Sequence, residues 1–133
     1  MSLVVAIARK WLGTKFHHQG RKLGVGVDCI GLIAEVAKEL GLSFEDRIDY
    51  ARAPQDGELQ RELEKYLIPA ELKIGCVALF KMEKEPQHVG IITDYGVAGL
   101  GLIHSYAQSR KVVEHNLDAS WRARIVGVYE FPV

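Results

Sequence analysis

The sequence predicts an α+β domain in which helices from the first half of the chain pack on an antiparallel sheet from the second half. Before residue 70, apolar residues recur at helical spacing, whereas after Gly75 short runs rich in valine, isoleucine and aromatic residues are separated by turn residues. A chain of 133 residues is long enough to bury one sizeable core. We therefore predict a single domain that spans residues 1–133.

Three segments have the apolar periodicity of helices, with capping and stop residues at their ends. The first runs through Leu3, Val4, Ile7, Ala8 and Trp11 and stops at Gly13; the second follows the N-cap Asp28 and ends at Gly41; the third covers Gly57 to Leu67 before Pro69. The glycine-rich stretch from Thr14 to Val27 predicts an irregular loop that wraps the front of a site. Ser43 to Pro54 predicts an extended link.

About five antiparallel strands are predicted after Gly75. They cover Cys76 to Phe80, His88 to Thr93, Leu100 to Tyr106, Lys111 to His115 and Arg124 to Phe131. Because helices come first and strands follow, the helices are expected to cover one face of this sheet.

The charge balance of the chain argues against several kinds of partner. Seventeen lysines and arginines balance 17 aspartates and glutamates, so the broad positive field that nucleic acids or anionic membranes attract is missing. No stretch approaches the roughly 20 apolar residues of a membrane span. Arg9 and Lys10 interrupt the N-terminal apolar run, which does not fit a signal peptide. We therefore predict synthesis in the cytoplasm, no nucleic-acid partner and no membrane span.

Cys29 is the first candidate for chemistry. It falls in the first turn of the second predicted helix, where unpaired backbone N–H groups and the helix dipole favour a thiolate. A thiolate nucleophile needs a histidine partner and a third polar group that holds the imidazole. His88 and His104 lie on neighbouring predicted strands, which place side chains together on one sheet face. The alternative is that Cys29 is a small buried hydrophobic residue and that the histidines are ordinary core or surface residues.

The two cysteines, Cys29 and Cys76, are too few for the disulfide framework of a small secreted protein, so both are expected to be free. No group of residues has the paired-cysteine or paired-histidine spacing of a zinc site. We predict neither a metal nor a cofactor.

Three motifs follow one another along the chain: Val27-Asp28-Cys29-Ile30-Gly31-Leu32, Gln87-His88-Val89-Gly90-Ile91 and Leu102-Ile103-His104-Ser105. They resemble the cysteine signature, the histidine strand and the third element of the NlpC family of papain-like endopeptidases, which cut peptidoglycan stem peptides. Isoleucine at position 30 stands where that family usually has a small residue. Trp11-Leu12-Gly13-Thr14 and Gly75-Cys76-Val77 also fall in the family's order, so the resemblance covers most of the chain.

The resemblance implies a nucleophilic Cys29, with His88 as base and then acid and His104 as the group that orients His88. The backbone N–H of Cys29 could form part of an oxyanion hole. The candidates for contacts to the substrate or the oxyanion are Asp28, Phe16, His17, His18 and Arg21. Two positions depart from the family: Phe16 stands where a tyrosine is common, and Cys76 where aspartate is common. His17, His18 and Arg21 are the candidates to replace the missing hydroxyl, the alternative being a solvated loop. Cys76 is expected to be a buried structural thiol.

The implied function is hydrolysis of peptidoglycan through an acyl-enzyme, at the bond between D-glutamate and a diamino acid. The chain resembles the branch of the family found in phage and prophage tails in its segment from Trp11 to Arg21, its short single-domain length and its missing export signal. This resemblance implies tail proteins as partners and delivery to the cell wall within a virion. Two alternatives stay open: a thiol acyltransferase or amidase on the same fold, and a catalytically silent structural or wall-binding tail module, for which the loss of the tyrosine hydroxyl at Phe16 is the discriminating feature.

Overall fold

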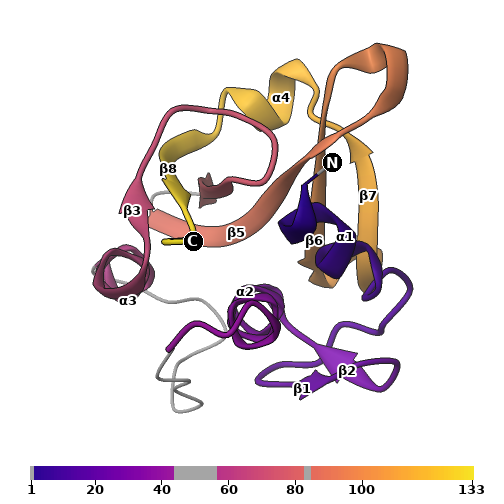
Figure 1. The fold of residues 1–133 in the computed structure, drawn as a ribbon. Helices are drawn as coiled ribbons and strands as arrows, with labels where there is room; N and C mark the ends of the chain where they lie inside the picture. Colours follow the sequence, from indigo (N-terminus) through magenta and orange to yellow (C-terminus); the bar gives the residue numbers. More distant parts are fainter. Residues whose placement is uncertain (1, 44–56, 83–84) are drawn as a thin grey trace.

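The computed structural model describes residues 2–43, 57–82 and 85–133, which form an α+β domain as the sequence predicts (Figure 1). Its helices are α1 (Leu3–Arg9), α2 (Cys29–Glu39), α3 (Glu58–Tyr66) and α4 (Ala119–Arg122), with two short 3-10 helices, η1 (Gly96–Ala98) and η2 (Ala107–Ser109). Its strands are β1 (Arg21–Lys22), β2 (Gly26–Val27), β3 (Ile68–Pro69), β4 (Val77–Met82), β5 (Glu85–Asp94), β6 (Leu100–Tyr106), β7 (Lys111–Asn116) and β8 (Ile125–Glu130). The link predicted from Ser43 to Pro54 lies, beyond Ser43, outside the described residues.

One antiparallel sheet of six strands, in the order β3-β8-β4-β5-β6-β7, forms the larger layer of the domain. The five predicted strands are its β4 to β8. The sixth, β3, pairs Ile68 with Glu130 and Pro69 with Tyr129 at one edge. A two-residue strand that contains proline gives no periodic signal, and proline is tolerated in a sheet at such an edge.

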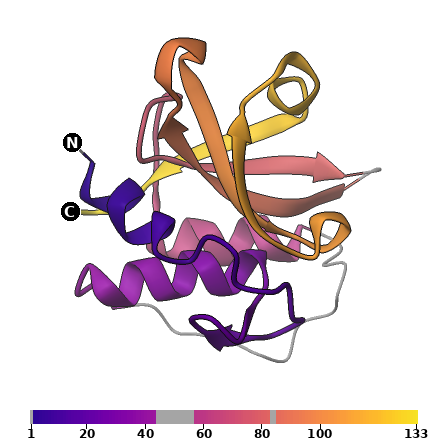
Figure 2. The same cartoon turned by 90° about the vertical axis from the view of Figure 1, so that its right-hand side faces the viewer.

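Helix α2 lies beneath the curved sheet, with α3 beside it (Figure 2). The Asp28 side chain caps α2 by accepting a hydrogen bond from the Gly31 N–H at 2.8 Å. Leu32, Ile33 and Val36 repeat at helical spacing and are fully buried. Burial of this apolar face on β5 and β6 fixes where the first turn of α2, and therefore Cys29, meets the sheet.

Residues on the two faces of the sheet belong to two apolar clusters. Val89, Ile91 and Ile103 face the helices and join the larger cluster. Phe80 and Leu102 belong to a second cluster on the opposite face, which α4 covers through Trp121. Because side chains alternate along a strand, the face that carries a given residue of β5 or β6 follows from this pattern.

The loop predicted from Thr14 to Val27 contains a small hairpin, in which Arg21 pairs with Val27 and Lys22 with Gly26. Two-residue strands are too short to give the alternation by which strands are predicted. None of the helices within the described ranges is long and apolar enough to cross a membrane.

Candidate active site

Cys29 is the first residue of α2 and is half-buried, with a free thiol. Backbone N–H groups of Val89, Ile30 and Cys29 itself contribute hydrogen bonds to its sulfur. Val89 directly follows His88 on β5. The packing of α2 on the sheet therefore brings the sulfur to the β5 backbone immediately beside His88.

Burial and the neighbouring Asp28 carboxylate raise the pKa of the Cys29 thiol to about 12, and the three backbone N–H groups lower it by less than this. The expectation that the helix terminus favours the thiolate is therefore wrong for this structure. Desolvation of a charged sulfur costs more than the first turn of a helix returns. The group that meets the sheet is a neutral thiol.

The structure brings His88 and His104 together from neighbouring strands, as the sequence predicts. Nε2 of His88 lies 2.6 Å from Nδ1 of His104, and both side chains are buried. Gly90 makes this contact possible, because a Cβ atom there would lie 2.5 Å from the Leu102 Cδ1 and 3.0 Å from the His104 Cβ. The glycine of the His-Val-Gly-Ile motif thus leaves room for the second histidine.

Burial keeps both imidazoles neutral. It lowers the pKa of His88 to about 3. Burial also lowers the pKa of His104 to about 2, with further lowering by the neighbouring His88 and His115. A neutral imidazole has one donor and one acceptor nitrogen, so the pair is suited to hold one ring in a single orientation and to accept a proton on the other.

Sequence reasoning missed His115, which extends this pair to three imidazoles. Nε2 of His104 lies 2.9 Å from Nε2 of His115, and Nδ1 of His115 lies 2.8 Å from the carbonyl oxygen of Asn116. His115 is paired in register with Leu102, two residues from His104, so it shares the face of His104. The alternation of β7 was the signal that could have found it.

Aromatic rings pack around the three imidazoles. The ring centroid of Trp121 lies 5.8 Å from that of His88, 4.9 Å from that of His104 and 6.0 Å from that of His115. Tyr106 stacks on His104 with a centroid separation of 5.1 Å. These rings help to bury His88 and His104, and this burial lowers the pKa of both imidazoles.

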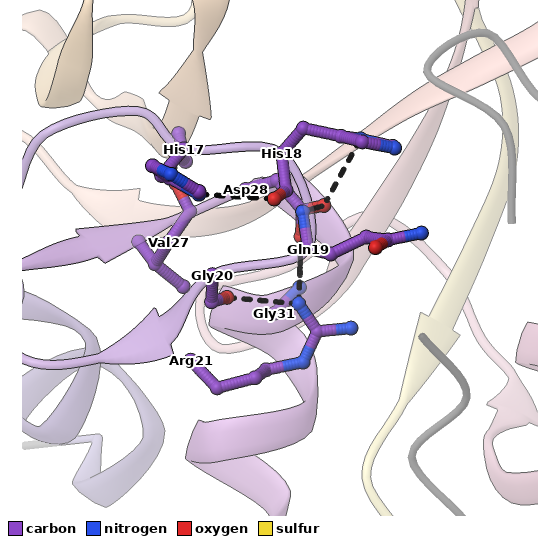
Figure 3. Close-up of polar contacts among 9 residues, drawn as sticks. His17, His18, Gln19, Gly20, Arg21, Val27, Asp28 and Gly31 are labelled. Carbon is purple, nitrogen blue, oxygen red and sulfur yellow. Dashed lines mark hydrogen bonds and ion pairs between the residues drawn. The ribbon is translucent and has the colours of Figure 1, made fainter. Parts of the chain in front are cut away.

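Asp28 connects the loop before α2 to the helix (Figure 3). Besides capping Gly31, its carboxylate accepts the Gln19 N–H at 2.7 Å and pairs with the Arg21 Nη1 at 3.1 Å. His18 Nδ1 lies 3.9 Å from the same carboxylate. Of the predicted oxyanion-hole candidates, His18 and Arg21 are therefore held around Asp28.

The loop lies close against the first turn of α2. A Cβ atom on Gly31 would lie 2.5 Å from the Gly20 carbonyl oxygen and 2.7 Å from the Arg21 Nη1. A second contact joins this segment to β6: the buried hydroxyl of Ser105, the residue after His104, donates to the Val27 carbonyl at 2.6 Å. The segment that carries Cys29 is thus fixed to the strand that carries His104.

The remaining predicted residues are placed as follows. Phe16 is half-buried, and its backbone bridges to Val27, two residues before Cys29. His17 is exposed, and its Nδ1 contacts the His18 carbonyl at 3.0 Å. Cys76 is buried, and its thiol donates to the Glu71 carbonyl at 3.4 Å, which fits the structural thiol that was predicted.

Within the described ranges, no three or more histidine, cysteine, aspartate or glutamate side chains are placed so that they could hold a metal ion.

Replacement of Asp28 by alanine is expected to destabilise the domain by about 3 kcal/mol, because it removes a helix cap and leaves Arg21 partly buried without its carboxylate. Asp118→Ala is the matched control: Asp118 also caps a helix, accepting the Trp121 N–H at 2.9 Å, but in an exposed position. Its loss is expected to cost about 1 kcal/mol. Urea unfolding monitored by fluorescence measures both, and equal losses would show that the Arg21 pair contributes nothing.

The comparison with family models matches residues 13–130 to the NlpC/P60 family. Among solved structures, the chain is similar to an NLP/P60 family protein described as similar to lipoprotein, from Staphylococcus aureus Mu50 (17% identity, TM-score 0.67, 97% of this chain and 40% of that one). It is also similar to an NlpC/P60 family protein from Bacillus cereus ATCC 10987 (19%, 0.69, 96% and 39%) and to the NlpC/p60 domain of the peptidoglycan hydrolase SagA (20%, 0.65, 96% and 96%). No curated protein matches the chain.

These structural similarities establish a shared fold. The chain spans about two fifths of the first two proteins, 40% and 39% of their chains, but 96% of the SagA domain. An antiparallel sheet with a cysteine-bearing helix packed on it and histidines on its strands defines the papain-like class. The family match covers most of the sequence, so the chain belongs to the NlpC/P60 family, a family of cysteine peptidoglycan hydrolases. The resemblance seen in the sequence is thereby confirmed at the level of the family.

Proposed function

We propose that this chain is a cysteine endopeptidase that hydrolyses peptidoglycan stem peptides through a thioester, with Cys29 as the nucleophile. His88 is the base and then the acid, and His104 orients it. The observation that supports this proposal most directly is the position of the Cys29 sulfur at the β5 backbone beside His88, whose Nε2 is held 2.6 Å from His104. A thiol, a base and a group that orients the base are the parts that thiol catalysis needs.

The reaction starts from a neutral thiol and a neutral imidazole, since burial raises the pKa of Cys29 and lowers that of His88. In this proposal the Cys29 side chain turns from the Val89 N–H towards His88, so that the sulfur meets His88 Nδ1, the nitrogen that does not contact His104. The thiol proton moves to this nitrogen as the sulfur attacks the substrate carbonyl carbon. The imidazolium thus forms only beside a developing negative charge, which offsets the cost of burying it.

The tetrahedral intermediate then collapses. The carbon–nitrogen bond breaks, His88 Nδ1 returns its proton to the departing amine, and a thioester on Cys29 remains. A water molecule gives a proton to His88 and attacks the thioester, and the carboxylic acid product leaves as the thiol is restored. The backbone N–H of Cys29 donates to the oxyanion, an interaction that typically contributes about a hundredfold to a thousandfold in rate.

The loop that carries Phe16, His17, His18 and Arg21 forms one wall of the substrate site in this proposal. It lies directly against the first turn of α2 through Gly20 and Gly31. Because His18 and Arg21 are held by Asp28, their contribution is to fix the loop rather than to donate to the oxyanion. Phe16 offers an apolar surface where the family commonly has a hydroxyl.

The bond that we propose lies between D-glutamate and the diamino acid of the stem peptide. The SagA domain, whose whole length the chain nearly covers, belongs to a peptidoglycan hydrolase. Digestion of purified peptidoglycan, with mass spectrometry of the soluble fragments, tests the proposal. We expect fragments that end in D-glutamate and new amino groups on the diamino acid; cleavage at another bond would correct the substrate assignment.

The same experiment separates the alternatives. If an added amine acceptor appears in the products at the expense of water, the chain is an acyltransferase. If peptidoglycan is bound but no fragment is released, the silent wall-binding module is the better assignment. In that case Phe16→Tyr is the variant to make, because it restores the hydroxyl that the family commonly has at this position.

A narrower part of the proposal concerns delivery. The segment from Trp11 to Arg21 resembles the tail-associated branch of the family, so we propose that the protein reaches the cell wall as part of a phage or prophage tail. Purified phage particles from the host are expected to contain the protein, detected by an antibody. Its detection outside cells that release no particles, exported by a general secretion route, would overturn this part while leaving the enzymatic proposal intact.

A further inference from the structure

The row of imidazoles formed by His88, His104 and His115 ends at the carbonyl oxygen of Asn116. This carbonyl sets the direction of each hydrogen bond between the imidazoles. We propose that His115 is a positioning residue that fixes the tautomer of His88, so that Nδ1 of His88 is free of its proton and able to accept one from a thiol. The inference rests on the proposed function for its consequence, but the tautomer itself is a property of the protein alone.

The direction follows from the outermost contact. The Asn116 carbonyl oxygen can only accept, so Nδ1 of His115, 2.8 Å away, must carry a proton and donate it. A neutral imidazole carries one proton, so Nε2 of His115 is an acceptor. The nitrogen that faces it at 2.9 Å, Nε2 of His104, must therefore be the donor.

The same reasoning passes through His104 to His88. With its proton on Nε2, neutral His104 has an acceptor at Nδ1. His88 Nε2, 2.6 Å away, must then donate its own proton to His104. His88 consequently has no proton on Nδ1. The protein thus holds the base in the one neutral form that can take a proton at this nitrogen.

Burial makes the assignment depend on His115. His104 is fully buried and His88 is 7% exposed, so water does not compete strongly for their nitrogens. Among the described groups around them, Trp121 and Tyr106 contact the imidazoles through their ring faces and edges. Without the acceptor at residue 115, the Nε2–H of His104 would lose its hydrogen-bond partner, and an unsatisfied buried donor costs about 1–3 kcal/mol. His104 avoids this cost by moving its proton to Nδ1, which reverses the bond to His88.

His115 is half-exposed, so its replacement removes a hydrogen-bond acceptor without opening a cavity in the core. His115→Leu and His115→Ala remove the acceptor. His115→Gln keeps an amide oxygen that can accept from His104 and is the conservative rescue. Lys111→Gln is the matched control, because Lys111 lies on the same strand and face as His115 but is exposed and four residues away along β7.

The test reads the tautomer directly from the nitrogen-15 chemical shifts of the imidazoles in labelled protein, together with the rate constants for peptidoglycan peptides. In the wild type, His115→Gln and Lys111→Gln, we expect the proton of His88 on Nε2. In His115→Leu and His115→Ala, we expect it to move wholly or partly to Nδ1, and kcat to fall about tenfold or more with little change in KM. Thermal unfolding identifies a variant that does not fold.

A wild-type His88 that carries its proton on Nδ1, or a His88 tautomer that is unchanged in both His115→Leu and His115→Ala, would overturn the inference. These spectra do not depend on turnover. Failure of the proposed enzyme activity therefore shows in the peptidoglycan digestion, and failure of the tautomer assignment shows in the spectra.

Discussion

Cys29→Ala is expected to lower the release of stem-peptide fragments from purified peptidoglycan by at least about a thousandfold, because no thioester can form without the sulfur. Cys29→Ser is expected to lose nearly as much. A hydroxyl is harder to deprotonate than a thiol, and neutral His88, whose pKa burial lowers to about 3, is a weak base. The release of soluble fragments from labelled peptidoglycan over time measures both variants.

The second cysteine provides the matched control. Cys76 is buried just before β4, and its thiol donates to the Glu71 carbonyl, away from the histidines. Cys76→Ala should retain the wild-type rate when the folded fractions are equal, as judged by circular dichroism. If Cys29→Ala retains wild-type activity, Cys29 is not the nucleophile.

The helices and the central strands could be predicted from the sequence because their signals are local. The apolar repeat of α2, its Asp28 cap and the alternation of β4 to β8 each depend on residues close together in the chain. The hairpin of β1 and β2 and the edge strand β3 could not be predicted in this way. Each of these strands is only two residues long. Strands β1 and β2 pair with each other, and β3 pairs with the distant strand β8, where Glu130 lies opposite Ile68.

The residues of the candidate site also differ in whether a local sequence signal predicts them. Cys29, His88 and His104 stand in motifs that the sequence shows, and strand adjacency correctly predicted the contact between the two histidines. The participation of His115 depends on the register between β6 and β7, which no motif records. The charge state of Cys29 was predicted wrongly because helix position is visible in the sequence, whereas the burial that outweighs it depends on the packing of α2 against β5.

The stability of the domain is expected to fall steeply as the pH drops below neutrality, and His88 and His104 are the cause. At pH 7 these imidazoles are uncharged in both the folded and the unfolded chain. Below the ordinary histidine pKa of 6.5, the unfolded chain takes up a proton on each, whereas the folded chain does not until pH about 3 for His88 and about 2 for His104. Because the unfolded chain binds more protons in this window, acid favours unfolding.

The size of this loss can be estimated from the linkage between proton binding and folding. Each imidazole contributes about 1.4 kcal/mol per pH unit within the window, so two of them remove about 5 kcal/mol over roughly two pH units. A domain of this size typically has a free energy of unfolding of about 5–15 kcal/mol. Urea unfolding at a series of pH values between 7 and about 4.5 measures the slope.

Two variants separate the buried histidines from other acid-sensitive groups. His88→Gln removes one of the two proton-binding sites and is expected to reduce the histidine part of the slope by about half, while it lowers stability at neutral pH. His17→Gln removes an exposed histidine and is the matched control. Two results would contradict this prediction: a wild-type free energy of unfolding that is constant between pH 7 and 5, or a pH slope in both variants equal to that of the wild type. Either result would mean that burial does not hold the two imidazoles neutral. The hydrogen bonds between neutral imidazoles that orient His88 would then not form.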